Sequence, residues 1–162
     1  MIVKFKTKWN NSCDSIANFY SRQNDYFTTA ELMTGENQMY CNICGISCDA
    51  LYGSTLYTAP NNIIINLNRG KQAVYECRVI FPERLDLTNY VTFKNSNTIF
   101  ELYAMICHIG PSSMSGHFVA YCKNRLDKKW YLYNDAIVSY CEDPFKNSND
   151  KLIYILFYQV VK

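Results

Sequence analysis

Two short runs of aromatic and β-branched residues, separated by a polar segment, constrain most strongly what this chain can fold into. The runs are Phe118 to Lys123 and Trp130 to Tyr133, and Asn124 to Lys129 lies between them. Residues of this kind favour extended backbone, and a short polar segment between two such runs favours a turn. The pattern therefore predicts a β-hairpin, whose strands bring side chains that are distant in the sequence next to one another.

The register of this hairpin decides which side chains share a face. If Lys123 pairs with Trp130, the alternation of side chains places His117 and Asn134 on the same side as diagonal neighbours. Asp135 then points to the other side. A shift of one residue would exchange the positions of Asn134 and Asp135, and the sequence does not specify the turn type. Both residues therefore remain candidates for the partner of His117.

A histidine beside a carboxamide or a carboxylate can act as a general base. One ring nitrogen must keep its proton in a fixed tautomer, so that the other can accept a proton from a nucleophile. Asparagine has this orienting role in cysteine enzymes. The alternative is structural: His117 would be an ordinary polar residue where a strand begins, and Asn134 and Asp135 would form the turn that ends the next strand. The spacing alone leaves both interpretations open.

Outside the hairpin, turn-forming residues divide the chain after Tyr40 into short apolar runs that are typical of strands. Connections of hairpin length leave no room for crossover helices, so we expect a mainly antiparallel sheet. Earlier in the chain, Asp14 to Arg22 has the apolar spacing of a short amphipathic helix, and we expect a further turn over Thr29 to Met33. The predicted strands are Ser54 to Thr58, Asn62 to Asn68, Tyr75 to Phe81, Ile99 to Gly110, His117 to Lys123, Trp130 to Asn134, Ile137 to Tyr140 and Lys151 to Val160.

Composition excludes several classes of function. The 162 residues are 49% hydrophobic and 15% aromatic, which is enough to bury the core of one compact domain. The formal net charge is only +2 and the lysines are scattered, which argues against a nucleic-acid binder. No apolar run approaches the roughly 20 residues of a membrane span. The abundant tyrosines favour a protein as the partner, rather than nucleic acid or a membrane.

The cysteines suggest a reducing environment and half of a metal site. The chain has eight, but a core of this size does not require disulfides, and charged residues occupy the place of a signal peptide's apolar segment. We therefore expect reduced thiols and an intracellular protein, cytoplasmic or nuclear. Cys41 and Cys44 have the spacing of half a zinc site, which needs four ligands. Cys48 could supply a third ligand, although its spacing is not typical. We expect no required cofactor, with zinc at this half site only an option.

Three segments resemble the histidine box of the ubiquitin-specific proteases, papain-like cysteine enzymes that remove ubiquitin. They are Gly116 to Tyr121, Trp130 to Val138 and Tyr154 to Tyr158. Upstream, Leu32 to Cys44 resembles the second half of the family's finger, and Val79 to Leu87 resembles its V-x-F-P-x-x-L-D-L segment. In order and spacing the resemblance covers roughly residues 12 to 159.

The resemblance implies an α+β fold that forms the C-terminal part of a papain-like catalytic domain. Residues 12–70 would form a partial finger and palm, and residues 71–162 the palm sheet with the histidine box. It implies a catalytic role for His117, with Asn134 as the third member of the triad and Asp135 as a close accessory. In the family, the cysteine pair of the finger is completed by a second pair from a hairpin nearer the N-terminus.

The same resemblance gives a role to the segment Gly110 to Gly116, which joins two predicted strands just before the histidine. It would line the channel for the Gly-Gly tail of ubiquitin, where glycine permits two backbones to approach closely. The predicted substrate-binding residues are Gly110, Ser115, Gly116 and Phe118. The alternative is an ordinary solvated connection. His108, two residues before this segment, is expected to be a hydrogen-bonded structural histidine.

The family's nucleophile lies in a Gly-Asn-Thr-Cys-Tyr type of box, and this sequence has no good match to it. Asn11-Ser12-Cys13 is similar, but only 27 residues separate Cys13 from Cys41, too few for a helical thumb. We therefore expect Cys13 to be structural or incidental. The expected function is the histidine-bearing half of a deubiquitinating cysteine protease, inactive alone. Its partners would be ubiquitin or ubiquitin conjugates and an N-terminal catalytic half. The alternative is an inactive ubiquitin-binding module.

Overall fold

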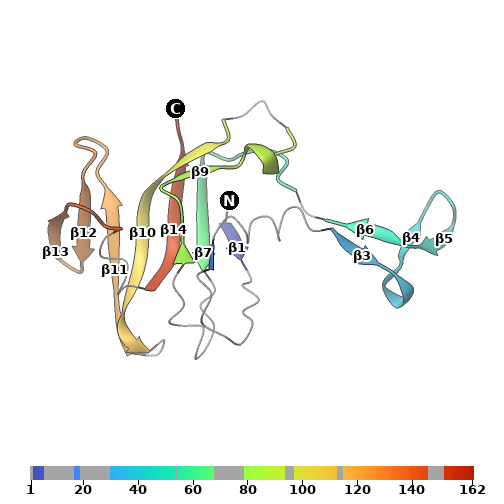
Figure 1. Cartoon of the computed structure of the whole chain (residues 1–162), viewed down its shortest axis with the longest axis horizontal. Coiled ribbons are helices and arrows are strands. Elements are labelled where there is room, and N and C mark those ends of the chain that lie inside the picture. Colours follow the sequence, from blue (N-terminus) through green and yellow to red (C-terminus); the bar gives the residue numbers. More distant parts are fainter. Residues whose placement is uncertain are drawn as a thin grey trace.

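The main feature of the computed structural model is one eight-stranded sheet. The structure describes residues 2–5, 17–18, 30–53, 55–67, 79–93, 97–112, 115–145 and 152–162. Seven strands follow one another across the sheet in the order β1-β7-β14-β10-β11-β12-β13, and β9 pairs with β10 beside this path (Figure 1). Their bounds are β1 Ile2–Phe5, β7 Asn62–Leu67, β9 Arg84–Asp86, β10 Ile99–Ser112, β11 Ser115–Lys123, β12 Trp130–Asn134, β13 Ile137–Cys141 and β14 Leu152–Val160.

Pairing within this sheet is antiparallel except between β1 and β7, which confirms the predicted mainly antiparallel arrangement. Six of the predicted strands correspond to β7, β10, β11, β12, β13 and β14, with ends that differ by up to two residues. The strand predicted over Ser54 to Thr58 is wrong, because within its described part only an isolated bridge from Leu56 to Val91 forms. Of Tyr75 to Phe81, only β8 (Val79–Ile80) is a strand, and residues 75–78 lie outside the described part.

The core of the sheet follows from the alternation of apolar residues along its strands. On β7, Ile63, Ile65 and Leu67 are buried while the residues between them are not, as expected for a strand with one covered face. The side chains of Leu102 on β10 and Leu156 on β14 are fully buried. Each such side chain stabilises the fold by roughly 1.5–3 kcal/mol relative to an exposed one. The strands that carry His117 and Asn134 are therefore part of a well-packed sheet.

Residues 30–53 form a separate extension, which Figure 1 shows projecting away from the main sheet. It consists of two small two-stranded sheets, and none of its residues is buried. Its elements are β3 Glu31–Met33, the 3-10 turn η1 Gly35–Asn37, β4 Met39–Cys41, β5 Ile46–Cys48 and β6 Ala50–Tyr52. The predicted turn over Thr29 to Met33 is wrong for Glu31–Met33, because these residues pair with β6 as a strand.

The predicted helix over Asp14 to Arg22 falls mostly outside the described residues. Its described part, β2 (Ala17–Asn18), is a strand that pairs in parallel with β8, so the helix prediction is wrong there. The helical elements of the described part are η1 and a second 3-10 turn, η3 (Thr88–Tyr90). Within that part no helix has the length and apolar character needed to cross a membrane.

Candidate functional site

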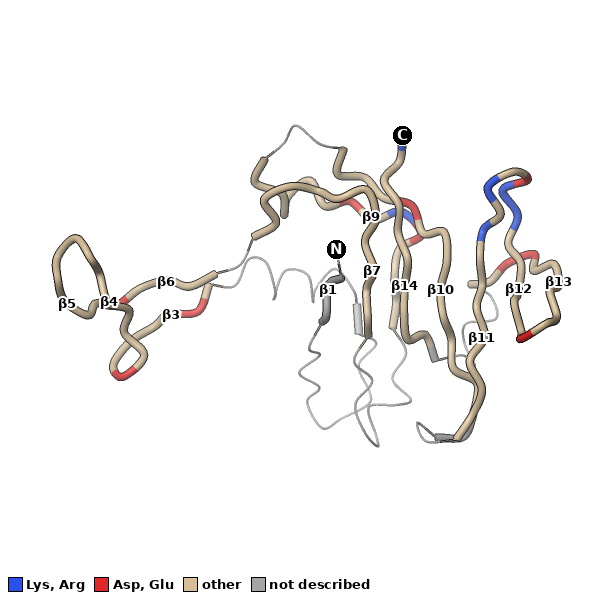
Figure 2. Tube along the Cα trace, turned by 180° about the vertical axis from the view of Figure 1, so that it is seen from behind, with Lys and Arg blue, Asp and Glu red and all other residues tan. Residues whose placement is uncertain are grey.

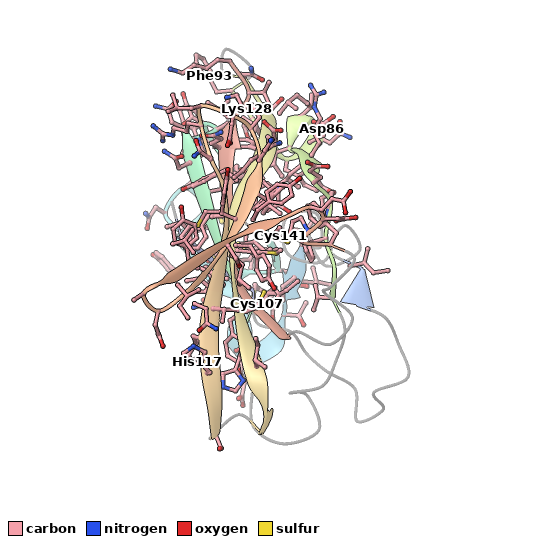
Figure 3. The ribbon with its side chains drawn as sticks, turned by 90° about the vertical axis from the view of Figure 1, so that its left-hand side faces the viewer. Asp86, Phe93, Cys107, His117, Lys128 and Cys141 are labelled. Atoms are coloured by element: carbon pink, nitrogen blue, oxygen red, sulfur yellow. The ribbon has the colours of Figure 1, made fainter. Side chains whose placement is uncertain are left out.

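The β11–β12 hairpin has the register on which the site prediction depends. Lys123 pairs with Trp130 and Ala120 with Tyr133, which places Asn134 diagonally across from His117. Basic residues lie on the turn at the far end of this hairpin (Figure 2). Figure 3 shows His117 at the opposite end of the sheet from Lys128, which lies in that turn. His117 therefore lies far from the basic turn.

His117 and Asn134 meet through their side chains, at a distance of 2.6 Å between Nε2 and Oδ1. A carboxamide oxygen can only accept a hydrogen bond, so Nε2 carries the proton and donates it. In the neutral ring this leaves the lone pair of Nδ1 free to accept a proton. The side chain of His117 is 46% exposed, so a reactant can reach it from solvent.

Asp135 lies on the same side as Asn134, so the prediction that it points away is wrong. Its Oδ2 is 3.7 Å from Nε2 of His117. The reason is local: Asn134 pairs with Ile137, so Asp135 opens a two-residue turn, and its φ of 51° ends the strand alternation there. A carboxylate at this distance favours a protonated imidazole, but Asp135 is 81% exposed and water weakens the attraction.

The strand before His117 is positioned by close backbone packing around a buried histidine. A Cβ on Gly116 would overlap the His108 ring and lie 2.6 Å from the carbonyl oxygen of Ile109. His108 is only 3% exposed, and its ring packs edge-on against Phe118 at a centroid distance of 4.8 Å. The Phe118 ring also meets Tyr154 on β14 edge-on at 5.4 Å. Both neighbours of His117 in the sequence are thus fixed against the sheet.

The predicted substrate-binding residues lie together beside His117, but on strands rather than in a loop. β10 continues to Ser112 and β11 begins at Ser115, with an irregularity in register between Ile109 and Ser112. A Cβ on Gly110 would lie 2.6 Å from the Cα of Gly116, so these two backbones are in close contact. All four residues, Gly110, Ser115, Gly116 and Phe118, are exposed.

A thiol beside the imidazole is not found in the part of the chain that the structure describes. There, the side chain of His117 contacts Asn134 and Asp135, and no cysteine sulfur bonds to it. None of the six described cysteines takes part in a disulfide. Cys13 lies outside the described residues, as does Cys77.

A second group of reactive side chains lies in the extension, where the sulfur atoms of Cys41, Cys44 and Cys48 lie within 4.8 Å of one another. The backbone N–H of Cys44, followed by its side chain, lowers the pKa of the Cys41 thiol. Desolvation by partial burial raises the pKa of the Cys48 thiol. The sequence predicts Cys41 and Cys44 as a half site and offers Cys48 as a third ligand of untypical spacing, and the structure brings the three sulfur atoms together. Such a cluster could bind a metal ion.

Comparisons with known proteins agree on one family. A family model described as ubiquitin carboxyl-terminal hydrolase matches residues 6–158. Ubiquitin carboxyl-terminal hydrolase Usp2 of Drosophila melanogaster is 32% identical over 143 residues, which cover 83% of this chain and 15% of that protein. Ubiquitin carboxyl-terminal hydrolase 4 of Mus musculus is likewise 32% identical over 83% of this chain, and the match covers 14% of its own length. The chain thus spans about 15% of these relatives.

Among solved structures, a chain of the SAGA Ubp8/Sgf11/Sus1/Sgf73 DUB module superposes on this one with a TM-score of 0.71. The superposition covers 99% of this chain and 35% of that chain, at 21% sequence identity. At this level of identity the similarity concerns the fold.

Proposed function

This chain belongs to the ubiquitin carboxyl-terminal hydrolase family, and on that premise we propose that it is the histidine-bearing part of a deubiquitinating cysteine protease. The observation that carries the proposal is the 2.6 Å contact between Nε2 of His117 and Oδ1 of Asn134. It fixes one tautomer of an exposed imidazole, which is what a general base beside a cysteine requires.

In the proposed reaction Nδ1 of His117 takes the proton of a cysteine thiol. The resulting thiolate attacks the carbonyl carbon of ubiquitin's terminal glycine, and the imidazolium donates its Nδ1 proton to the departing amine. A thioester remains, and Nδ1 then takes a proton from the water that hydrolyses it. The Nε2 proton stays on the bond to Asn134 throughout, while the carboxylate of Asp135 at 3.7 Å favours the imidazolium.

We assign the approach of the substrate to the exposed strand ends beside His117. Gly110 and Gly116 offer backbone without side chains, so an extended Gly-Gly tail can lie close to them. Ser115 and the exposed face of Phe118 border the same surface. This assignment explains why glycine suits both positions, although their packing around His108 also contributes.

The remaining parts of the proposal concern the domain as a whole, the source of the nucleophile and the location in the cell. We infer that the chain forms the C-terminal part of a papain-like domain, with partial finger and palm over residues 12–70 and palm over 71–162. The nucleophile would come from an N-terminal catalytic half, and the chemistry would need no cofactor. We place the protein inside the cell, in the cytoplasm or the nucleus, because ubiquitin conjugates and free thiols occur there.

A second candidate function is binding of ubiquitin without cleavage. It is favoured by the absence of a cysteine beside His117 in the described ranges. The exposed aromatic and aliphatic side chains of β12 and β13, among them Tyr133, Ile137 and Tyr140, could serve a protein partner in either case.

The test measures binding and hydrolysis separately on this chain. Binding is titrated with ubiquitin, and hydrolysis is followed with ubiquitin that carries a fluorogenic amide on its C-terminal glycine. We expect saturable binding and no hydrolysis by the chain alone. Addition of the part of the protein that carries the nucleophile should restore hydrolysis. A ubiquitin probe with a thiol-reactive C-terminus should then label that part and leave Cys13 unmodified.

Substitutions of single residues test the proposed roles of His117 and Asn134. His117→Gln in the reconstituted enzyme should lower kcat by about 10⁴-fold or more, and Asn134→Ala by a smaller factor with little change in KM. Ser139→Ala, an exposed change on β13, is the matched control and should leave the rate unchanged. Binding of ubiquitin without any restored hydrolysis would favour the second candidate function. Labelling of Cys13 would overturn the assigned source of the nucleophile. An unchanged rate of hydrolysis in His117→Gln would refute the proposed protease function.

A further inference from the structure

The turn between β11 and β12 concentrates positive charge at one end of the main sheet (Figure 2). This basic turn consists of residues 124–129, all of them exposed. Three of them, Arg125, Lys128 and Lys129, are cations, and Asp127 is its one acidic residue. Three cations and one carboxylate leave the basic turn with a formal charge of +2. It therefore attracts a partner of negative charge.

Hydrogen bonds hold the basic turn in one conformation. Oδ1 of Asn124 accepts the backbone N–H of Leu126 at 2.8 Å. Asp127 bonds within the hairpin, because its Oδ1 accepts the N–H of Lys129 at 3.0 Å and its Oδ2 accepts the hydroxyl of Tyr131 at 2.7 Å. Leu126 is 94% exposed among the cations. A partner that covers it would meet a turn that is already ordered, which lowers the entropic cost of binding.

The strand β13 gives the sheet an open edge. It is the last strand in the order of the sheet, and within the described part of the chain it pairs with β12 alone (Figure 1). Asn134 pairs with Ile137 across a two-residue turn, so this pair exchanges its hydrogen bonds and every second pair after it does the same. Val138 and Tyr140 therefore direct their backbone N–H and C=O groups outward.

This edge lacks the features that usually prevent an edge strand from pairing. The sequence of β13, Ile-Val-Ser-Tyr-Cys, contains neither a charged residue nor a proline. Four of its five residues are exposed. An extended segment of another polypeptide can therefore add to the sheet along β13.

The basic turn adjoins the open edge. Trp130, which follows the turn, pairs with Cys141 at the end of β13. The ammonium of Lys129 lies over the ring of Tyr140, 5.7 Å from its centroid. A segment that runs along β13 and continues past Cys141 would thus come to the cations of the basic turn.

We propose that the basic turn and the outer edge of β13 together bind an extended, acidic segment of a protein partner as an added strand. The backbone of that segment would pair with Val138 and Tyr140. Its carboxylates would meet the cations of the basic turn, and an apolar side chain would cover Leu126. Backbone pairing would supply affinity, and the charge would select the partner.

The strand edge is what favours a polypeptide over other anionic partners. A lipid surface or a nucleic acid could use the charge of the basic turn, but neither can pair with the backbone of a strand. The site is also separate from the proposed hydrolase chemistry, because Lys128 and His117 lie at opposite ends of the sheet (Figure 3). Its test is therefore independent of whether the chain supports hydrolysis.

The experiment titrates the whole chain with labelled peptides and follows fluorescence anisotropy. One peptide alternates glutamate with valine, which favours extended backbone with one acidic face. The control peptide has lysine in place of glutamate. We expect the acidic peptide to bind saturably at low salt and to lose about tenfold or more in affinity at high salt, because salt screens exposed charges. The lysine peptide should not bind.

Variants of the chain test the two parts of the site. Arg125→Glu and Leu126→Ser should each weaken binding of the acidic peptide by about tenfold. Lys162→Glu makes the same change in net charge after the end of β14, so it is the matched control and should bind like the unmodified chain. With the peptide at about ten times its dissociation constant, amide exchange at Val138 and Tyr140 should slow by about tenfold.

Several results would overturn the proposal. Equal affinity for the two peptides, or unchanged affinity in Arg125→Glu, would show that the basic turn does not select an acidic segment. Binding without slower exchange at Val138 and Tyr140 would show that β13 does not pair with it.

Other partners give results of their own. Binding to vesicles of phosphatidylcholine and phosphatidylserine, or to single-stranded DNA, without binding to the acidic peptide would reassign the basic turn to a lipid surface or to nucleic acid. If a second copy of the chain covers β13, exchange at Val138 and Tyr140 slows as the protein concentration rises, sedimentation shows a dimer, and the peptide does not bind.

Discussion

The main sheet and the extension are built from similar short strands, but only one of them has a core. Leu102 and Leu156 in the main sheet are fully buried. In the extension no residue is buried, Ile43 is 97% exposed and Leu51 is 73% exposed. An isolated two-stranded ribbon is at best marginally stable in water. The main sheet can therefore fix an imidazole and a carboxamide 2.6 Å apart, while the extension needs a bound ion or a partner to become rigid.

The largest expected difference between the two regions is the effect of removing an aliphatic side chain. Leu156→Ala should lower the free energy of unfolding by about 2–5 kcal/mol, because it leaves a cavity in the core. Ile43→Ala should change it by no more than about 0.5 kcal/mol, since that side chain is already in water. Urea unfolding followed by fluorescence measures both. Equal effects would show that the extension and the main sheet do not differ in burial as the structure has it.

Zinc should have the opposite pattern of effects on the two regions, because an ion bound by Cys41, Cys44 and Cys48 should stabilise the extension and leave the stability of the main sheet unchanged. Zinc at 100 times its dissociation constant stabilises the state that binds it by about 2.7 kcal/mol. Amide exchange in β4 and β5 should slow by about 100-fold when zinc is added and recover with a chelator, while β10 and β14 stay unchanged. Slower exchange in both regions would mean that the extension and the sheet are coupled.

The third prediction concerns glycines, one from each region. Gly116→Ala should destabilise the protein by about 1–3 kcal/mol, because the new methyl group would overlap the His108 ring beside His117. Gly53→Ala in the extension meets nothing nearer than Ala30 at 3.8 Å, so its effect should be small. The imidazole nitrogen spectrum also reports the site, because the chain has only two histidines. We expect Gly116→Ala to shift the His117 signals, whereas unchanged signals would show that the packing around His108 does not position the site.

The sequence predicted the site better than it predicted the extension, for a physical reason. Aromatic and β-branched runs of the hairpin have one buried face, so the apolar pattern restricts the registers that can form, and the assumed pairing of Lys123 with Trp130 is the one that the structure has. The same pattern located most of the main strands. The position of Asp135 could not be derived, because it depends on a positive φ in a turn rather than on strand alternation.

In the extension the apolar pattern carries less information, because no face is buried. The predicted turn is wrong for β3, and the sequence spacing of Cys48 from Cys44 is not typical of a metal ligand. The signal that could have found it is the hairpin itself: Gly45 marks the turn, and counting outward from it pairs Cys41 with Ile46. Two residues further on, Cys48 returns to the same face.

The smallest expected effect is a loss of stability of the main sheet at low pH. The Thr88 side chain donates to Oδ1 of Asp86 at 2.6 Å and its backbone N–H at 2.8 Å, and these bonds lower the pKa of Asp86 from its ordinary 3.8. Because the pKa is lower in the folded state, the stabilisation is complete above the ordinary value and is lost as the pH falls through the folded value. Asp86 is largely exposed, so the loss should be about 1 kcal/mol or less. Urea unfolding of the main sheet, measured from neutral pH downwards, should show this loss, and Asp86→Asn should reduce it. An unchanged pH dependence in Asp86→Asn would assign the acid sensitivity to other carboxylates, such as Asp127, whose pKa is lowered by the backbone N–H of Lys129.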